Sequence, residues 1–267
     1  MKKSLLTKLA VIGMSVAVAF AFSACGSSDS SSDSSSSEKE TYVVGAEPTF
    51  APFDTTDENG DFDGFDKDMM DAIAKDQGFK VKYKTMSFDS LIPALNSGTI
   101  DIIASGMNCQ SKERKEKVDF SKVYYDSGLI VVVKKGSKIK SIDDVDSSMK
   151  VASQTGTTGA DKANSLAEKG KISEAVILDG YDTCMQQLSN GDVAAVIIDK
   201  PVADNYLAKQ PGKFKEVGDI MNAEGYGIGV KKGNKALLKK INKGLNDIID
   251  SGEFQKICKK WKIKSKY

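Results

Sequence analysis

The 267-residue sequence carries 38 basic and 37 acidic side chains, a formal net charge of +1, and no histidine. Charges of both signs are mixed along the chain, which indicates no surface for a nucleic-acid backbone. The lack of histidine excludes Ser-His-Asp and Cys-His catalysis and imidazole metal sites, so an enzyme would have to use carboxylates, lysine or tyrosine. Neither a cofactor nor a metal is expected.

The first forty residues are predicted to lie outside the fold. A lysine-containing start and an apolar run from Leu9 to Phe22 precede Cys25, as in an export signal that is too short to be a transmembrane helix. The segment from Phe22 to Cys25 resembles a bacterial lipoprotein processing site, which would make residues 1–25 a signal peptide ending at a lipidated Cys25; plain secretion is the alternative. Residues 26–40 are mostly serine and predict a flexible linker.

The next part of the chain alternates strands and helices. Its predicted elements are a strand over 41–46, a helix over 65–77, a strand over 80–85, a helix over 87–97 and a strand over 100–104. Between the first two lies an acidic loop, 54–63. Such alternation predicts an α/β fold with a mostly parallel sheet flanked by helices. Ligands bind such sheets beyond the carboxyl ends of the strands.

The same alternation then repeats. Strands are predicted over 129–134, 150–153, 175–178 and 193–198, and helices over 158–169, 181–189 and 201–209. The repeat predicts a second lobe, 128–225. A strand over 226–230, a helix over 235–251 and a last helix through Trp261 are expected to return to the first lobe, which then comprises 41–127 plus 226–267. Two strands joining the lobes would form a hinge.

Arg114 is the only arginine among the 38 basic residues. Lysine serves wherever a solvated positive charge is enough, so a single arginine indicates a place that needs a planar fork of N–H donors for a carboxylate or phosphate. The alternative is a surface arginine on the charged face of a helix, SKERKEK.

Two further candidates follow predicted strands. The segment QTGTTG at 154–159 opens a helix, where free backbone N–H groups can bind an anion. Asp199 ends an apolar strand, where its carboxylate can receive an ammonium group. Each has an alternative role as a helix cap.

Aromatic and cysteine side chains complete the candidates. Phe50 and Phe88 lie at strand ends, where rings can line a pocket, whereas Phe53 is assigned to the core. Cys109, Cys184 and Cys258 are interpreted as small buried hydrophobes, with one disulfide pair as the alternative. Residues 59–64 imitate the start of a calcium loop, but the twelfth position holds methionine in place of glutamate, so no metal is expected there.

Together these segments resemble the extracytoplasmic amino-acid-binding proteins of ABC importers, which have the two-lobed type II periplasmic-binding-protein fold. The resemblance covers 41–261. It is carried by GFDKDMMDAIAKDQG (64–78), FDSLIPALNSGTIDIIASGM (88–107), ERKEKVDFSKVYY (113–125), QTGTTG (154–159), LSNGDVAAVIID (188–199) and GEFQKICKKW (252–261).

The resemblance also implies roles for individual residues. Arg114 and the backbone N–H groups of Thr157 and Thr158 would hold the α-carboxylate, and Asp199 the α-ammonium. The remaining implied contacts are Gly106 and Asn108 beside the ammonium, Phe50 and Phe88 around the ligand, and Glu47 and Gln154 at positions that vary among relatives. Since the segment after Gly106 is one residue longer than is usual in the family, either Asn108 or Cys109 occupies the small polar position.

The implied function is capture of a free, polar amino acid between two lobes and its delivery to an ABC permease with its ATPase subunit. The protein is expected to be a monomer, extracytoplasmic and lipid-anchored to the membrane through Cys25, with no nucleic-acid partner. Two alternatives remain. One is an amino-acid-sensing module acting with a separate signalling partner, since no membrane span follows the fold; the other is a dehydratase on the same fold.

Overall fold

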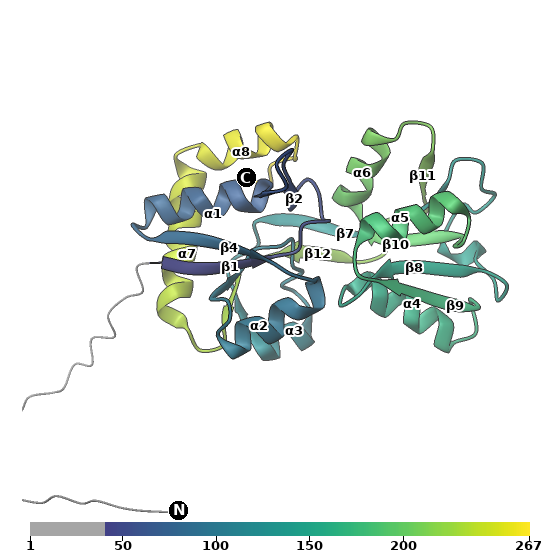
Figure 1. The fold of residues 1–267 in the computed structure, drawn as a ribbon, viewed down its shortest axis with the longest axis horizontal. Helices are drawn as coiled ribbons and strands as arrows, with labels where there is room; N and C mark the ends of the chain where they lie inside the picture. The colour runs from purple at the N-terminus through teal and green to yellow at the C-terminus, as the bar shows by residue number, and fades with distance from the viewer. Residues whose placement is uncertain (1–40) are drawn as a thin grey trace, which may run out of the picture. The chain divides into compact units, whose positions relative to one another are not determined.

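Two β-sheets organise residues 41–267, which are the residues that this computed structural model describes (Figure 1). The predicted signal peptide 1–25 with Cys25 and the predicted linker 26–40 lie outside the described residues. Among the helices of residues 41–267, none combines the length and the apolar character of a membrane span.

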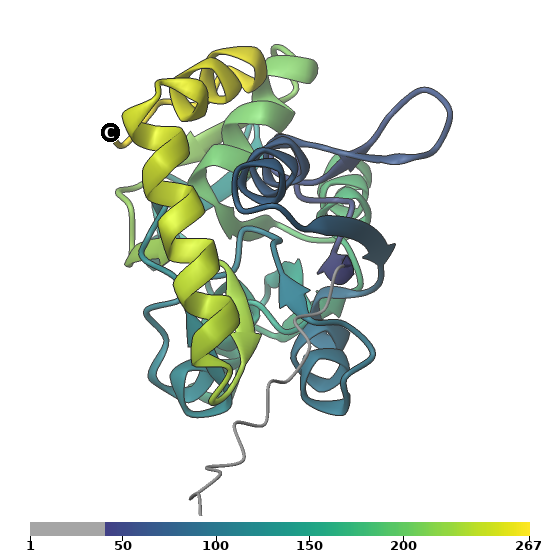
Figure 2. The same cartoon turned by 90° about the vertical axis from the view of Figure 1, so that its left-hand side faces the viewer.

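The first sheet has five strands with mixed pairing. In spatial order they are β4 (Lys80–Thr85), β1 (Thr41–Ala46), β5 (Ile102–Ile103), β13 (Gly229–Lys231) and β6 (Val118–Phe120). β1 is parallel to β4 and β5, whereas β13 is antiparallel to β5 and β6. On one side lie α1 (Phe65–Asp76), α7 (Lys235–Asp250) and α8 (Glu253–Trp261), and on the other α2 (Leu91–Ser97) and α3 (Lys112–Lys117) (Figures 1 and 2).

The apolar run around β5 is buried on both of its faces. Ile102 packs in the cluster that includes Val44 and Ile241 of α7, while its neighbour Ile103 packs in the cluster of Leu91 and Leu95 of α2. Successive side chains of a strand point to opposite faces. A strand covered by helices on both sides therefore needs consecutive apolar residues, as the sequence has here.

The second sheet is also mixed. In spatial order its strands are β11 (Phe214–Val217), β7 (Tyr125–Lys134), β10 (Ala195–Asp199), β8 (Lys150–Gln154) and β9 (Glu174–Leu178), and β12 (Ala223–Tyr226) pairs with β7. β8 is parallel to β9 and β10, whereas β7 is antiparallel to β10, β11 and β12. Helices α5 (Tyr181–Asn190) and α6 (Lys200–Lys209) lie on one side and α4 (Thr158–Glu168) on the other (Figure 1).

The chain passes between the sheets twice, from β6 to β7 and from β12 to β13. β7 and β12 pair with each other there, from Tyr125 opposite Tyr226 to Gly128 opposite Ala223. We call the residues around the first sheet the first lobe and those around the second sheet the second lobe. The lobe boundaries given above remain a prediction.

The predicted α/β fold with two sheets is confirmed, with corrections of detail. Only β4–β1–β5 and β9–β8–β10 are parallel, so "mostly parallel" is too strong. The predicted strand over 226–230 is two strands, because the chain changes sheets at Gly227, whose amide donates to Met107 O at 3.1 Å.

Short or highly charged elements were not predicted. These are the hairpin β2 (Thr55–Thr56) and β3 (Phe62–Asp63) within the acidic loop, β6, β11 and the 3-10 turn η2 (Ile142–Asp144), while the first turn of the predicted helix over 87–97 is the 3-10 turn η1 (Phe88–Ser90). The interpretation of Cys109, Cys184 and Cys258 as buried hydrophobes is confirmed, since all three are buried free thiols.

Candidate ligand-binding site

Five of the predicted site residues lie at the carboxyl ends of four strands. Glu47 follows β1, Gly106 and Asn108 follow β5, Gln154 ends β8 and Asp199 ends β10. In each lobe the two strands concerned are parallel neighbours, so their ends meet at one edge of the sheet. Hydrogen bonds then connect these edges across the lobes.

Arg114 makes one of these connections. Its Nη1 donates to Asn108 O at 3.2 Å in the first lobe and its Nη2 to Gly156 O at 2.9 Å in the second. The guanidinium lies 5.3 Å from the centre of the Phe88 ring, and the residue is only 8% exposed. Burial lowers the pKa of the guanidinium, while the carboxylates of Glu224 and Asp199 raise it. The alternative of a solvated surface arginine is wrong, because the side chain is buried between the lobes.

The start of α4 lies beside this guanidinium. Thr157 caps the helix, since its Oγ1 accepts from the Ala160 amide at 3.1 Å, and the same hydroxyl donates to Gln154 O at 2.7 Å. Thr158 Oγ1 donates to Glu224 Oε1 at 2.6 Å. The alternative role of this segment as a helix cap is therefore present, and the first N–H groups of a helix remain suited to an anion in addition.

Asp199 is 5% exposed and accepts two phenolic hydroxyls. Tyr226 Oη donates to its Oδ1 at 2.7 Å and Tyr181 Oη to its Oδ2 at 3.2 Å. Its side chain does not cap α6, so that alternative is wrong. Burial, followed by the charge of Glu224, raises the pKa of Asp199 to about 7, against the two tyrosine hydrogen bonds. A cationic group placed here would favour the ionised carboxylate.

Glu47 and Gln154 join the lobes at a second point. Gln154 Nε2 donates to Glu47 Oε2 at 2.9 Å and to Asp179 O at 3.0 Å, while Gln154 Oε1 is buried without a partner among the described residues. Thr49 donates to Glu47 through its amide at 3.0 Å and its hydroxyl at 3.1 Å. Burial raises the pKa of Glu47. The pair thus offers both a carboxylate and an amide oxygen.

Phe50 packs directly against Gly106. A Cβ on Gly106 would lie 2.3 Å from the Phe50 ring, so the close approach requires glycine. The Phe50 ring centre lies 6.0 Å from that of Tyr181 and 5.9 Å from that of Tyr226, so aromatic rings form one wall of the site. Phe53 is fully buried among aromatic rings, as predicted.

Hydrogen bonds within the first lobe fix the loop that follows β5. The Gly106 amide donates to Asp66 Oδ2 at 2.7 Å, so this N–H is engaged within the first lobe. Asn108 O receives Arg114, and the Asn108 side chain accepts from the Gln110 amide at 2.9 Å. The Cys109 side chain instead packs on Gly227, where a Cβ would lie 2.8 Å from its own.

Three buried residues of this cluster were missed in the sequence: Tyr181, Glu224 and Tyr226. Tyr181 was read only as a helix start and Tyr226 only as a strand residue. The one signal in the sequence that could have identified the two tyrosines is that a buried tyrosine hydroxyl needs a hydrogen-bond partner. Glu224, a single acid between predicted elements, gave no signal.

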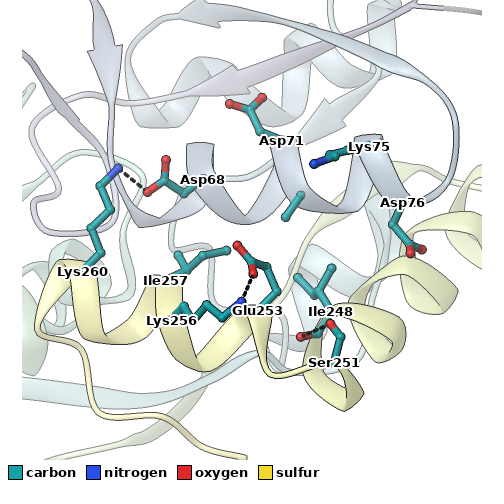
Figure 3. Close-up of a pocket in the computed structure, with 11 residues that line it drawn as sticks. Asp68, Asp71, Lys75, Asp76, Ile248, Ser251, Glu253, Lys256, Ile257 and Lys260 are labelled. Atoms are coloured by element: carbon teal, nitrogen blue, oxygen red, sulfur yellow. Dashed lines mark hydrogen bonds and ion pairs between the residues drawn. The ribbon is translucent and has the colours of Figure 1, made fainter.

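Another surface hollow lies away from these residues. It holds about 710 Å³ between α1, α7 and α8, and two ion pairs lie in its lining, Asp68 with Lys260 at 2.6 Å and Glu253 with Lys256 at 2.8 Å (Figure 3). Two smaller hollows adjoin the site. One, of about 360 Å³, is lined by Phe88, Arg114 and Gly156, and another, of about 420 Å³, by Glu47 and Asp179.

Comparisons with known proteins show the family to which the chain is similar. Residues 42–264 match the family described as bacterial extracellular solute-binding proteins, family 3. A probable histidine-binding protein of Neisseria gonorrhoeae is 37% identical over 227 residues, 83% of each chain. The ABC transporter glutamine-binding protein of Bacillus subtilis (strain 168) is 34% identical over 76% of this chain and 74% of its own. An ancestral arginine-binding protein bound to arginine superposes with a TM-score of 0.79 at 43% identity, over 84% and 98% of the two chains.

Proposed function

This chain belongs to the bacterial extracellular solute-binding proteins of family 3, and we propose that it is the substrate-binding component of an amino acid ABC transporter. It captures a free amino acid between the two lobes and delivers it to a membrane permease that works with an ATPase subunit. The proposal includes a monomeric protein held at the membrane by a lipid on Cys25.

One observation carries the proposal: a buried guanidinium and a buried carboxylate lie in the same cluster with neighbouring hydrogen-bond groups. A free amino acid is a zwitterion, and burying it requires a partner for each charge. Arg114 and the start of α4 suit the α-carboxylate, and Asp199 suits the α-ammonium. Because these groups come from both lobes, a bound ligand favours the closed arrangement.

Glu47 and Gln154 would face the ligand's side chain. A carboxylate and an amide oxygen favour a cationic or amide side chain over an aliphatic or acidic one. The relatives described above are named for histidine, glutamine and arginine, which fits this class. We therefore expect Glu47→Gln to reduce affinity for arginine and lysine more than for glutamine.

The test is a thermal-shift screen with the twenty amino acids, cystine and ornithine, followed by isothermal titration calorimetry. Stabilisation by cationic or amide-bearing amino acids is the expected result, and stabilisation by none would overturn the proposal. Stabilisation only by aliphatic or acidic ones would reject the role of Glu47. Recovery of the bound amino acid unchanged after incubation separates binding from the dehydratase alternative.

A further inference from the structure

Glu224 is the one acidic residue on the crossing strand β12, and it stands at the junction of both lobes. Its neighbour Gly225 accepts from the Cys109 amide at 2.8 Å, which fixes β12 to the first lobe, while Glu224 itself lies opposite Ser127 of β7. The side chain reaches the start of α4 in the second lobe, at Thr158. Contacts with both lobes therefore fix the position of Glu224.

The Glu224 carboxylate is buried and only half satisfied. The residue is 4% exposed; Oε1 accepts the Thr158 hydroxyl at 2.6 Å, whereas Oε2 is buried with no hydrogen-bond partner among the described residues. An unpartnered buried oxygen is costly, particularly on an ionised group. Glu224 is also the carboxylate with the largest electrostatic effect on Arg114.

The proposed ligand carboxylate would contact Thr158, the hydrogen-bond partner of Glu224, through the Thr158 amide, and would also contact Arg114, on which the charge of Glu224 acts. Two ionised carboxylates that share partners in a buried site repel each other strongly, and one of them then binds a proton. The ligand carboxylate is the more acidic of the two. Even at a peptide C-terminus an α-carboxyl group titrates at about 3.5, against about 4.3 for a glutamate side chain, and the adjacent ammonium of a free amino acid lowers the pKa of its carboxyl group further. Glu224 is therefore the group expected to take the proton.

We propose that Glu224 takes up one proton from solvent when an amino acid binds, so that binding of the ligand carboxylate is linked to pH through this side chain. The inference rests on the proposed function, because it requires a ligand carboxylate at Arg114. In its protonated form Glu224 keeps one oxygen to accept from Thr158.

The other groups around Glu224 determine how clearly this linkage appears. Burial raises the pKa of Glu224, as does the charge of Asp161, whereas the hydrogen bond from Thr158, the nearby Asn108 side chain and the charge of Arg114 lower it. Asp199 of β10 is a further carboxylate in the same cluster, and it would release a proton when it receives the ligand ammonium. Comparing the proton uptake of the wild type with that of Glu224 variants therefore isolates the contribution of Glu224.

The experiment is isothermal titration calorimetry between pH 6 and 9 in buffers of different ionisation enthalpy, which counts the protons exchanged per ligand bound. The probe is whichever of the twenty amino acids, cystine and ornithine stabilises the wild-type protein most. Glu224→Gln keeps an oxygen for Thr158 but cannot be ionised. We expect this variant to take up fewer protons than the wild type, by up to about one, and to gain affinity relative to it as pH rises, by at most about tenfold per pH unit.

Two further variants separate this role from a structural one. Glu216→Gln is the matched control, because Glu216 is a half-buried glutamate of the same sheet whose partner is Lys200 at 3.1 Å; it should behave like the wild type. Glu224→Ala removes the acceptor of the Thr158 hydroxyl and should lose affinity at every pH. If Glu224→Gln does not fold, Glu224→Asp, which withdraws the carboxylate by one methylene, should show a reduced proton count.

The outcomes distinguish the two proposals. If the wild type binds none of the twenty amino acids, cystine or ornithine, the proposed function fails and this inference fails with it. If the wild type binds an amino acid and Glu224→Gln exchanges the same number of protons at every pH, only the role of Glu224 is overturned.

Discussion

Replacing Arg114 with lysine tests the central feature of the site. The guanidinium donates to Asn108 O at 3.2 Å and to Gly156 O at 2.9 Å, so it serves both lobes at once. A lysine keeps the positive charge, but a single ammonium cannot reproduce the planar fork. It would also lose the guanidinium face that lies over Phe88.

The expected loss follows from the hydrogen bonds. A hydrogen bond to a charged group contributes about 1.5–3 kcal/mol, and Arg114→Lys removes at least one from the closed, ligand-bound form. This corresponds to a roughly ten- to hundredfold weaker affinity for the amino acid. Because one carbonyl contact and the charge remain, the fold should persist, with a melting temperature lower by a few degrees at most.

Isothermal titration calorimetry measures the affinity and thermal unfolding checks the fold. Lys112→Ala is the control, since Lys112 lies exposed on the same helix and does not line the hollow beside Arg114. Arg114→Lys binding as tightly as the wild type, with Lys112→Ala also unchanged, would refute the reasoning.

Three further predictions concern other parts of the site. Gly156→Ala should weaken ligand binding in calorimetry, because a Cβ there would lie 2.9 Å from the Asp89 Cα across the lobes. Gly170→Ala is its control, since Gly170 has a similar positive φ but a Cβ there would have nothing within 4 Å. This variant should lose a comparable amount of stability and keep the wild-type affinity. Asp199→Asn should reduce affinity by at least ~tenfold, since the ammonium loses a charged acceptor; equal affinity in titrations would contradict its role. Burial raises the pKa of Asp66 from 3.8 to about 7, so its contribution to stability is complete below pH 4 and is lost as pH rises through 7. Asp66→Asn should flatten that decline by at most ~1.4 kcal/mol per pH unit, and an unchanged slope in denaturant titrations would argue against it.

Secondary structure was predicted correctly where the apolar pattern of the sequence matches the burial of the residues. The run around Ile102 and the stripe of α7 predicted their strand and helix correctly, because apolar periodicity reflects which face is covered. By contrast, β12 and β13 read as one strand. The local sequence of this segment favours an extended strand along its whole length. The change of sheet at Gly227 depends on contacts with residues more than a hundred positions away in the chain.

The same contrast between local sequence and tertiary contacts applies to the site. The single arginine identified Arg114 as unusual from composition alone, and the structure places it between the lobes. Whether Asp199 caps α6 or faces a ligand could not be decided from its local sequence, since both roles suit an acid before a proline. The orientation is set by the Tyr181 and Tyr226 hydroxyls, which only the tertiary fold brings there.

The position of β13 has a consequence for the order in which the chain can fold. This strand lies between β5 and β6, and α7 packs on α1, so the first sheet cannot be completed before the last forty residues are available. The second sheet needs only residues 125–226 and has no such delay. During synthesis or export the second lobe can therefore nucleate first, while the N-terminal segment exposes unpaired strand edges until the C-terminus arrives.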